Sequence, residues 1–468
     1  MKYYLRVCSL LLLMNAVSWH TVYAQTKVVL TPDAFIQQVK QFHPVARQAN
    51  LITENAVAGL LSARGSFDPV FELNNNSKSL DSVNYYRYNN TELKIPTAFA
   101  VEIKAGFEKS NGQFINPELT NGVASYIGVE IPLLNGLLMD KRRAALQQAK
   151  IFKLQSEQER LVLINDLLFD AYTTYWQWAG AYGLFKTYNN YVEVAEKRLR
   201  LVNVTFLHGD RSVADTVEAY TQLQNYQLLQ AEALMELNNK ALELSAYLWA
   251  GDGNPYLLPQ NYIPDTNQFE MLLPLRNIED LVKQLPGTHP RIKTYQYKLK
   301  DLEVERKLKF QNLLPVFNVR ANMLSKDYYR YKGLNAAYLE HNYKWGVTMK
   351  VPLLLRQGRG EYNKAQIKIK DINLQIAEKS WQLQTKVRQY YNEATQLQNQ
   401  LQIALTMYRN FNFLRSNEEL RFSQGESSLF LVNSRETKAL EMQQKLIQIR
   451  IKYLKAVYAI DWAMGTVR

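Results

Sequence analysis

Cysteine is nearly absent from this 468-residue chain, and Cys8 is its only representative. Because Cys8 lies in the N-terminal segment, the rest of the chain can form neither a disulfide nor a cysteine metal site. Beyond that segment no run of 18 apolar residues occurs, so we expect no transmembrane helix there. Membrane strands escape this test because their apolar residues alternate with polar ones.

Proline is absent from two long stretches, residues 133–254 and 353–468. Both stretches are rich in Gln, Leu, Ala, Lys and Glu, a composition typical of long helices. Each is interrupted once by a glycine flanked by polar residues, at Gly209 and at Gly425. This pattern indicates a helix C-cap followed by the next N-cap. The two stretches therefore predict two helical hairpins, with helices at 138–207, 210–250, 359–424 and 426–464.

The first 24 residues have the pattern of a secretory signal peptide. Lys2 and Arg6 precede the apolar run "VCSLLLLMNAV", and "VYA" ends the segment. Val22 and Ala24 fit the small-residue positions of a cleavage site, so we expect cleavage after Ala24. The run is too short for an anchor helix. An exported chain without disulfides is typical of a bacterial envelope.

The formal net charge of +13 becomes +11 without Lys2 and Arg6. The excess is spread along the chain, and no basic run is interleaved with aromatic residues. We therefore expect a solvated cationic surface and no nucleic-acid partner.

Proline placement repeats along the chain. Pro44 and Pro69 recur 246 residues later as Pro290 and Pro315, and Val-Phe follows the second proline of each pair. This repetition predicts a tandem duplication in which a short helix, at 45–66 or 291–313, precedes each set of strands. We assign a signal peptide at 1–24, a first repeat at 25–250, a crossover at 251–277 and a second repeat at 278–468.

Apolar residues of the first long helix recur at steps of four and three from Ile164 to Phe206. This 3.5-residue period predicts supercoiling against neighbouring helices. We interpret the aromatic run "YTTYWQW" as part of that packing seam. In each copy the short helix and the last helix together match the long helix in length. Stacked end to end, they would form a rod on the order of 100 Å long.

Alternating segments between the short and long helices predict membrane strands. "PVFNVRANM" and "YKWGVTMKV" in the second copy place apolar residues on one face and polar or small residues on the other. In the first copy Phe99, Val101, Ile103, Ala105 and Phe107 form the clearest lipid face. Several aromatic residues suit a membrane belt: Tyr328, Tyr329, Tyr331, Tyr343 and Trp345.

The number of strands in the first copy stays open, because strand crossings must be even. Either "YYRYNNTELKIP" forms a fourth strand, or one segment belongs to a long outer loop, and we favour the second. We expect external loops at 80–96, 111–123 and 325–341.

The chain lacks the residue patterns of common catalytic and metal-binding sites. No two of the five histidines have metal-ligand spacing, and His43 and His289 precede prolines in equivalent turns, so we interpret both as structural. No phosphate loop, nucleophile elbow or zinc-protease motif occurs. The carboxylates fall on heptad surfaces, where we expect solvation. The sequence therefore predicts no enzyme, no cofactor and no metal site.

The chain resembles the TolC-like outer-membrane efflux and secretion channels over essentially its whole mature length. The resemblance rests on "HP" after a short helix, on "PLLNG" followed by "KRRAALQQAK", and on Gly209, Arg211, Ser212 and Asp215 at the hairpin turn. It implies a mainly α chain with a membrane β-barrel segment. Long antiparallel coiled-coil helices form an α-barrel, and each tandem copy contributes strands to a shared trimeric β-barrel.

The resemblance also implies partners and a location. They are a homotrimer in outer-membrane lipid of a Gram-negative bacterium, a periplasmic adaptor and an inner-membrane transporter. The expected function is a passive exit duct for small-molecule efflux. Two alternatives are a type I protein secretion channel and a non-transporting surface scaffold or adhesin.

The resemblance places the hairpin tips at the periplasmic aperture. The residues assigned to it are Gly209, Arg211, Asp215, Glu218, Gly425, Ser427, Phe430, Leu431 and Ser434. Family members often have an arginine and two aspartates where this second copy has Ser427, Leu431 and Ser434, so a charged ring would come from Asp215 and Glu218. We hypothesise a closed state held by Arg211 with Asp215 and by Phe430 with Leu431.

Overall fold

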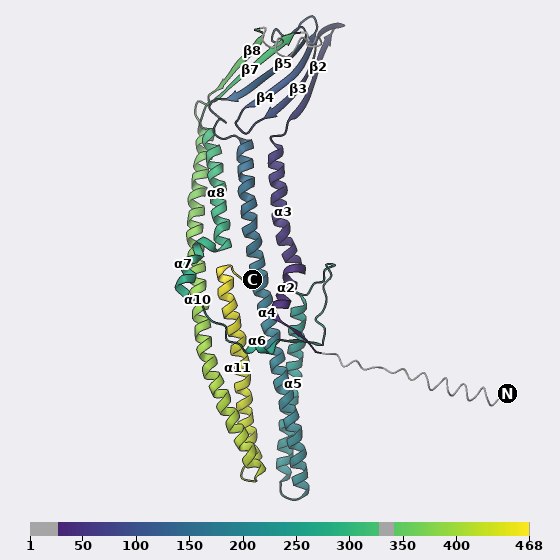
Figure 1. Cartoon of the computed structure of the whole chain (residues 1–468), viewed down its shortest axis with the longest axis vertical. Helices are drawn as coiled ribbons and strands as arrows, with labels where there is room; N and C mark the ends of the chain where they lie inside the picture. The colour runs from purple at the N-terminus through teal and green to yellow at the C-terminus, as the bar shows by residue number, and fades with distance from the viewer. Residues whose placement is uncertain (1–26, 327–340, 468) are drawn as a thin grey trace, which may run out of the picture. The chain divides into compact units, whose positions relative to one another are not determined.

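The computed structural model describes residues 27–326 and 341–467, so the predicted signal peptide lies outside the described residues. The described chain is mainly α-helical and contains a six-stranded antiparallel sheet (Figure 1). Within these residues, no helix combines the length and the apolar character needed to cross a membrane.

One order of elements occurs twice along the chain, as the repeated prolines predicted. A helix of 22 residues precedes strands, a helix of 67 or 68 residues follows them, and a last helix completes a hairpin. The first set is α3 (Pro44–Gly65), β2 (Val70–Leu80), β3 (Val83–Pro96), β4 (Glu102–Asn111), β5 (Gly122–Pro132), α4 (Lys141–Leu207) and α5 (Val213–Ser245). The second is α8 (Pro290–Gln311), β7 (Val316–Lys326), β8 (Tyr343–Lys350), α10 (Arg356–Ser423) and α11 (Leu429–Met464).

The two His-Pro pairs begin the short helices. Each proline occupies the first turn, where its missing N–H costs nothing. His43 Nδ1 accepts the N–H of Val45 at 3.2 Å, and His289 Nδ1 accepts the N–H of Arg291 at 3.0 Å. Both histidines are therefore N-caps, which confirms the structural interpretation. Each is preceded by an amphipathic helix that the sequence patterns did not predict, α2 (Pro32–Phe42) and α7 (Ile278–Thr288).

The six-stranded sheet runs in the order β2-β3-β4-β5-β7-β8, with antiparallel pairing throughout. "YYRYNNTELKIP" lies within β3, so the preference for a long outer loop was wrong, and only a short turn remains of the loop expected at 80–96. Of the expected loop at 325–341, residues 327–340 lie outside the described residues, as do Tyr328, Tyr329 and Tyr331.

The predicted alternation gives this sheet two different faces. One cross-strand row contains only apolar residues, one from each strand: Phe71, Leu93, Ala105, Ile127, Met323 and Tyr343. On the other face Glu130 accepts a hydrogen bond from Lys104 at 2.7 Å and pairs with Arg320 at 3.2 Å. Phe99 and Val101, expected on the lipid face of the first copy, precede β4, which begins at Glu102.

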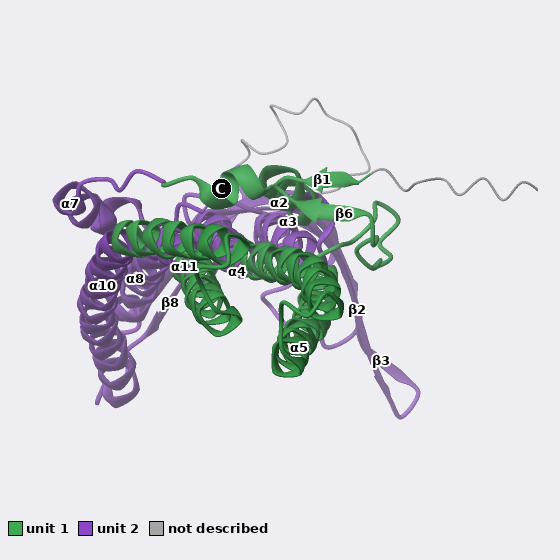
Figure 2. Ribbon diagram, turned by 90° about the horizontal axis from the view of Figure 1, so that it is seen from below, with its two compact units in different colours: residues 1–39, 171–272, 401–451 green, residues 40–170, 273–400, 452–468 purple. Residues whose placement is uncertain are grey.

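The chain divides into two compact units, which Figure 2 shows in green and purple. The first unit holds residues 1–39, 171–272 and 401–451, and the second holds 40–170, 273–400 and 452–468. The sheet belongs to the second unit, and both hairpin turns belong to the first. In the first unit β1 (Val28–Leu30) pairs in parallel with β6 (Tyr262–Pro264), which is followed by α6 (Thr266–Glu270).

Aromatic residues of α4 form the core of the first unit. Tyr175, Trp176 and Trp178 are buried, and Tyr175 stacks on Phe35 with ring centroids 5.8 Å apart. The Tyr175 hydroxyl donates to the carbonyl of Leu30 at 2.6 Å. Because these rings pack against the protein itself, the run "YTTYWQW" is a packing seam, as predicted.

Candidate functional site at the hairpin tips

Both hairpin turns have the same backbone design. Gly209 has φ 85° and Gly425 has φ 81°, a left-handed conformation that glycine adopts without steric cost. Each glycine N–H bonds a carbonyl three residues back, at 2.9 and 3.1 Å. The following N–H bonds one five residues back, at 3.0 and 2.9 Å. These bonds satisfy the last carbonyls of α4 and α10, so each tip is a closed helix end.

The turn after Gly209 begins α5 with a capping box. Ser212 Oγ accepts the N–H of Asp215 at 3.2 Å, and Asp215 Oδ2 accepts the N–H of Ser212 at 3.0 Å. The Arg211 guanidinium lies over the ring of Phe422, 4.3 Å from its centroid. Among the described residues, Arg211 and Asp215 therefore form no ion pair within one chain. The polar half of the hypothesised closure would need contacts between chains.

An apolar cluster joins the two hairpins behind the turns. Its buried members are Val202, Ala219, Phe422, Leu429 and Val432. Leu429 and Val432 are three residues apart, so they share the inner face of α11. Phe430 lies off that face and is 67% exposed, and Leu431 is also exposed. Phe430 is thus available to a partner and does not pack within its own hairpin.

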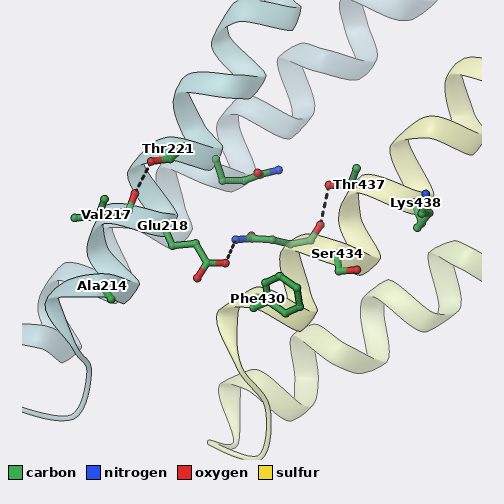
Figure 3. A pocket seen from close by; sticks show the side chains of 10 residues that line it. Ala214, Val217, Glu218, Thr221, Phe430, Ser434, Thr437 and Lys438 are labelled. Carbon is green, nitrogen blue, oxygen red and sulfur yellow. Dashed lines mark hydrogen bonds between the residues drawn. The ribbon is translucent and has the colours of Figure 1, made fainter.

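A groove of about 770 Å³ separates the first turns of α5 and α11. Figure 3 shows Glu218 from α5 and Phe430 from α11 on its two sides. Asn433 donates to Glu218 across it at 3.0 Å. Val217, Ser434 and Lys438 also line it. An amphipathic helix could place apolar side chains against Val217 and Phe430 and polar ones beside Glu218 and Lys438.

The remaining tip residue, Ser427, bonds within its own hairpin. Its hydroxyl donates to Glu418, and the Glu418 side chain also lies within 3.8 Å of Arg421. The structure therefore brings Glu218, Phe430 and Ser434 together at one groove, whereas Arg211, Asp215 and Ser427 stabilise the turns.

A buried polar network lies further along the hairpins. Arg198 of α4 donates to both oxygens of Glu436 of α11, at 2.7 and 2.6 Å, and reaches Glu419 of α10 at 3.4 Å. The hydroxyl of Tyr226 of α5 donates to Glu436 at 2.9 Å. One network thus connects all four helices of the two hairpins.

Glu436 contradicts the expectation that carboxylates lie on solvated heptad surfaces, because its exposed fraction is 0%. Burial alone would lower the pKa of Arg198, but the hydrogen bonds and charge of Glu436 offset this effect and raise it. Burial also raises the pKa of Tyr226, so its hydroxyl remains a donor. A signal for this network was present in the sequence: Glu436 lies seven residues after Leu429, two helical turns along the same face.

No group of three or more metal-binding side chains occurs in residues 27–326 and 341–467. The tip offers a groove, a capped turn and fixed ion pairs, which suit helix recognition.

Comparison with solved structures identifies the class of fold. The chain is similar to the Campylobacter jejuni CmeC outer-membrane channel at 14% identity and a TM-score of 0.61, covering 96% of this chain and 90% of that one. It is similar to the outer-membrane protein VceC from Vibrio cholerae at 13% identity and a TM-score of 0.62, covering 93% of this chain and 96% of that one. It is also similar to the open state of the Neisseria gonorrhoeae MtrE outer-membrane channel at 12% identity and a TM-score of 0.63, covering 93% of this chain and 88% of that one.

The chain therefore has the fold of the TolC-like outer-membrane channels. No protein-family model matches the sequence, and the search of curated proteins also found no match.

Proposed function

We propose that three copies of this chain form a passive outer-membrane exit duct. It would conduct small molecules from the periplasm to the exterior together with an inner-membrane transporter and a periplasmic adaptor. The signal peptide, the repeat boundaries and the assignment of the helical hairpins to the periplasm are parts of this proposal. The chain would supply the conduit, and the transporter would supply the energy.

The observation that carries the proposal is a two-faced sheet with two unpaired edges. Among the strands of residues 27–326 and 341–467, β2 pairs only with β3 and β8 only with β7, so both outer edges of the sheet lack a partner strand there. Exposed edges are excluded from lipid, because backbone groups there have no water to bond. Pairing β8 of one copy with β2 of the next removes both edges. Three copies would then close an eighteen-stranded barrel.

The apolar side chains also suit lipid contact. On β7 the apolar residues of this face extend from Phe317 to Met323. On β4 they extend from Ile103 to Phe107, which places them nearer the β4–β5 turn. The apolar band therefore crosses the strands obliquely, as a bilayer crosses the tilted strands of a barrel. The opposite face, with Lys104, Glu130 and Arg320, would line a water-filled lumen.

The groove beside Phe430 supports the part of the proposal that a periplasmic adaptor docks on this chain. Exposed apolar side chains flanked by Glu218 and Lys438 form the type of surface that binds an amphipathic helix. A non-transporting scaffold would use the helices, but it would not require the two-faced sheet.

Paired substitutions on β7 test this proposal. Val319→Asp places a carboxylate on the apolar face, whereas Asn318→Asp places the same group on the polar face. We expect Val319→Asp to cost up to a few kcal/mol, depending on its depth, and to reduce the amount of heat-modifiable trimer in the outer membrane. Asn318→Asp should leave that amount nearly unchanged. Equal yields, or a monodisperse monomer without detergent, would contradict the proposal.

Dye efflux from intact cells separates the possible cargoes. A deletion strain that loses efflux of small dyes supports a small-molecule duct. A strain that retains dye efflux but no longer secretes a protein would favour type I export.

A further inference from the structure

The apolar face of the sheet carries two charged residues along its described strands, and both are basic. Arg87 lies on β3 and Lys109 on β4, and both side chains are exposed. Lys109 is opposite Asn89, two residues from Arg87, so the two basic residues are diagonal cross-strand neighbours. At that spacing, roughly 7 to 8 Å, both side chains can reach one anionic group.

The position of the pair along the strands is specific. Lys109 follows the exposed apolar Phe107 by two residues on the same face, in the direction of the β4–β5 turn. Asn75, Asn89 and Asn111 surround the pair on that face. The apolar band thus ends in a polar row that contains hydrogen-bond donors and two cations.

Neither Arg87 nor Lys109 forms an ion pair within the described part of the chain. On the opposite face, Lys94, Lys104 and Arg320 all pair with glutamates. A basic side chain on a lipid-facing surface costs little stability at the edge of the apolar layer of a membrane, and the loss of free energy is several times larger at the centre of that layer. If the apolar face contacts a bilayer, the pair would therefore lie at the level where the headgroups begin.

We propose that Arg87 and Lys109 form a binding site for the phosphate of an anionic membrane lipid. The site rests on the proposed function, because it requires the apolar face of the sheet to contact a bilayer. Arginine binds phosphate through two parallel N–H donors, lysine adds a second positive charge, and the asparagine amides can donate to the remaining oxygens. The acyl chains of the same lipid would lie along Phe107 and Leu73.

Lipid binding to the detergent-purified assembly tests the site. The probes are phosphatidylglycerol and phosphatidylcholine, and bound lipid is counted by native mass spectrometry. In Arg87→Gln/Lys109→Gln we expect the affinity for phosphatidylglycerol to fall about fivefold for each removed cation, with phosphatidylcholine unaffected. The matched control, Lys344→Gln/Lys350→Gln, removes the same charge from the opposite face and should bind as the wild type does.

Three results would overturn the site. They are unchanged phosphatidylglycerol binding in Arg87→Gln/Lys109→Gln, an equal loss in the control, and full displacement of the lipid by excess inorganic phosphate. The last would assign the pair to a free anion. These results leave the proposed duct intact if the variants still extract as heat-modifiable trimers. A wild type that needs no detergent would contradict both the site and the duct.

Discussion

Arg198 of α4 and Glu436 of α11 form a bidentate ion pair, although 238 residues separate them in the sequence. The Arg198 side chain is 10% exposed and the Glu436 side chain 0%. Bidentate geometry and the Tyr226 hydroxyl compensate the desolvation of the carboxylate. The pair therefore fixes α4 to α11 in one register.

Removal of one partner should be much more harmful than removal of both. Arg198→Met leaves Glu436 buried and unpaired, so we expect a loss of about 3–5 kcal/mol in unfolding free energy. Arg198→Met/Glu436→Leu should recover part of it. Denaturant unfolding of the purified chain measures both. Arg415→Met, at a more exposed pair with Glu419, should cost only about 0–1 kcal/mol. A loss in Arg198→Met no larger than in this control would refute the prediction.

His289 should make stability dependent on pH. Burial, followed by the charge of Arg291, lowers its pKa from 6.5 to about 4. Below pH 6.5 the unfolded chain therefore binds a proton that the folded chain does not bind until about pH 4. The contribution of His289 to the unfolding free energy, about 3 kcal/mol, is complete above pH 6.5 and is lost as the pH falls towards 4.

His289→Asn retains a capping side chain without this titration. We expect its unfolding free energy to vary less than that of the wild type between pH 6.5 and 4. Parallel profiles for wild type and His289→Asn would show that another group is responsible.

The capping box at Ser212 and Asp215 should stabilise the start of α5. Asp215→Ala should weaken the first turn by about 1 kcal/mol and accelerate amide exchange there. If the tip restricts the duct, single-channel recordings should also show more frequent openings. Asp210→Ala changes the neighbouring turn without removing the box and should exchange as the wild type does. Identical protection in both variants would exclude a role for the box.

Phe430 should contribute to efflux without contributing to stability. Its side chain is 67% exposed beside the groove, so Phe430→Ala removes contact with a partner and little internal packing. We expect slower dye efflux from intact cells at an unchanged melting temperature. Phe413 of α10 is 65% exposed, and Phe413→Ala is the matched control. Equal efflux in the two variants would argue against docking at this groove.

Local patterns in the sequence were sufficient for the short and long helices of each repeat and for the hairpin turns, but not for α2 and α7. The 3.5-residue period marks the α4 seam, and residues from Leu168 to Val202 in that pattern are largely buried. Gly209 and Gly425 marked the turns because only a few residue types accept a positive φ at a helix end. The repeated prolines marked the starts of α3 and α8, because proline fits the first helical turn.

Strand β3 shows where local pattern was insufficient. Its segment "NNTE" carries polar residues on both faces, so alternation there is weak. The tertiary structure pairs β3 with β2 on one side and β4 on the other, and those backbone bonds do not depend on side-chain pattern.

At the hairpin tips, too, some features follow from the local sequence and others only from tertiary contacts. The sequence by itself determined the turns, the helix faces and the groups available at each tip. Only the tertiary structure decided that Arg211 stacks on Phe422 and that Glu436 is buried. The physical reason is that a cap or a period depends on neighbours within one or two helical turns, whereas a buried charge depends on a partner that folding brings from far along the chain.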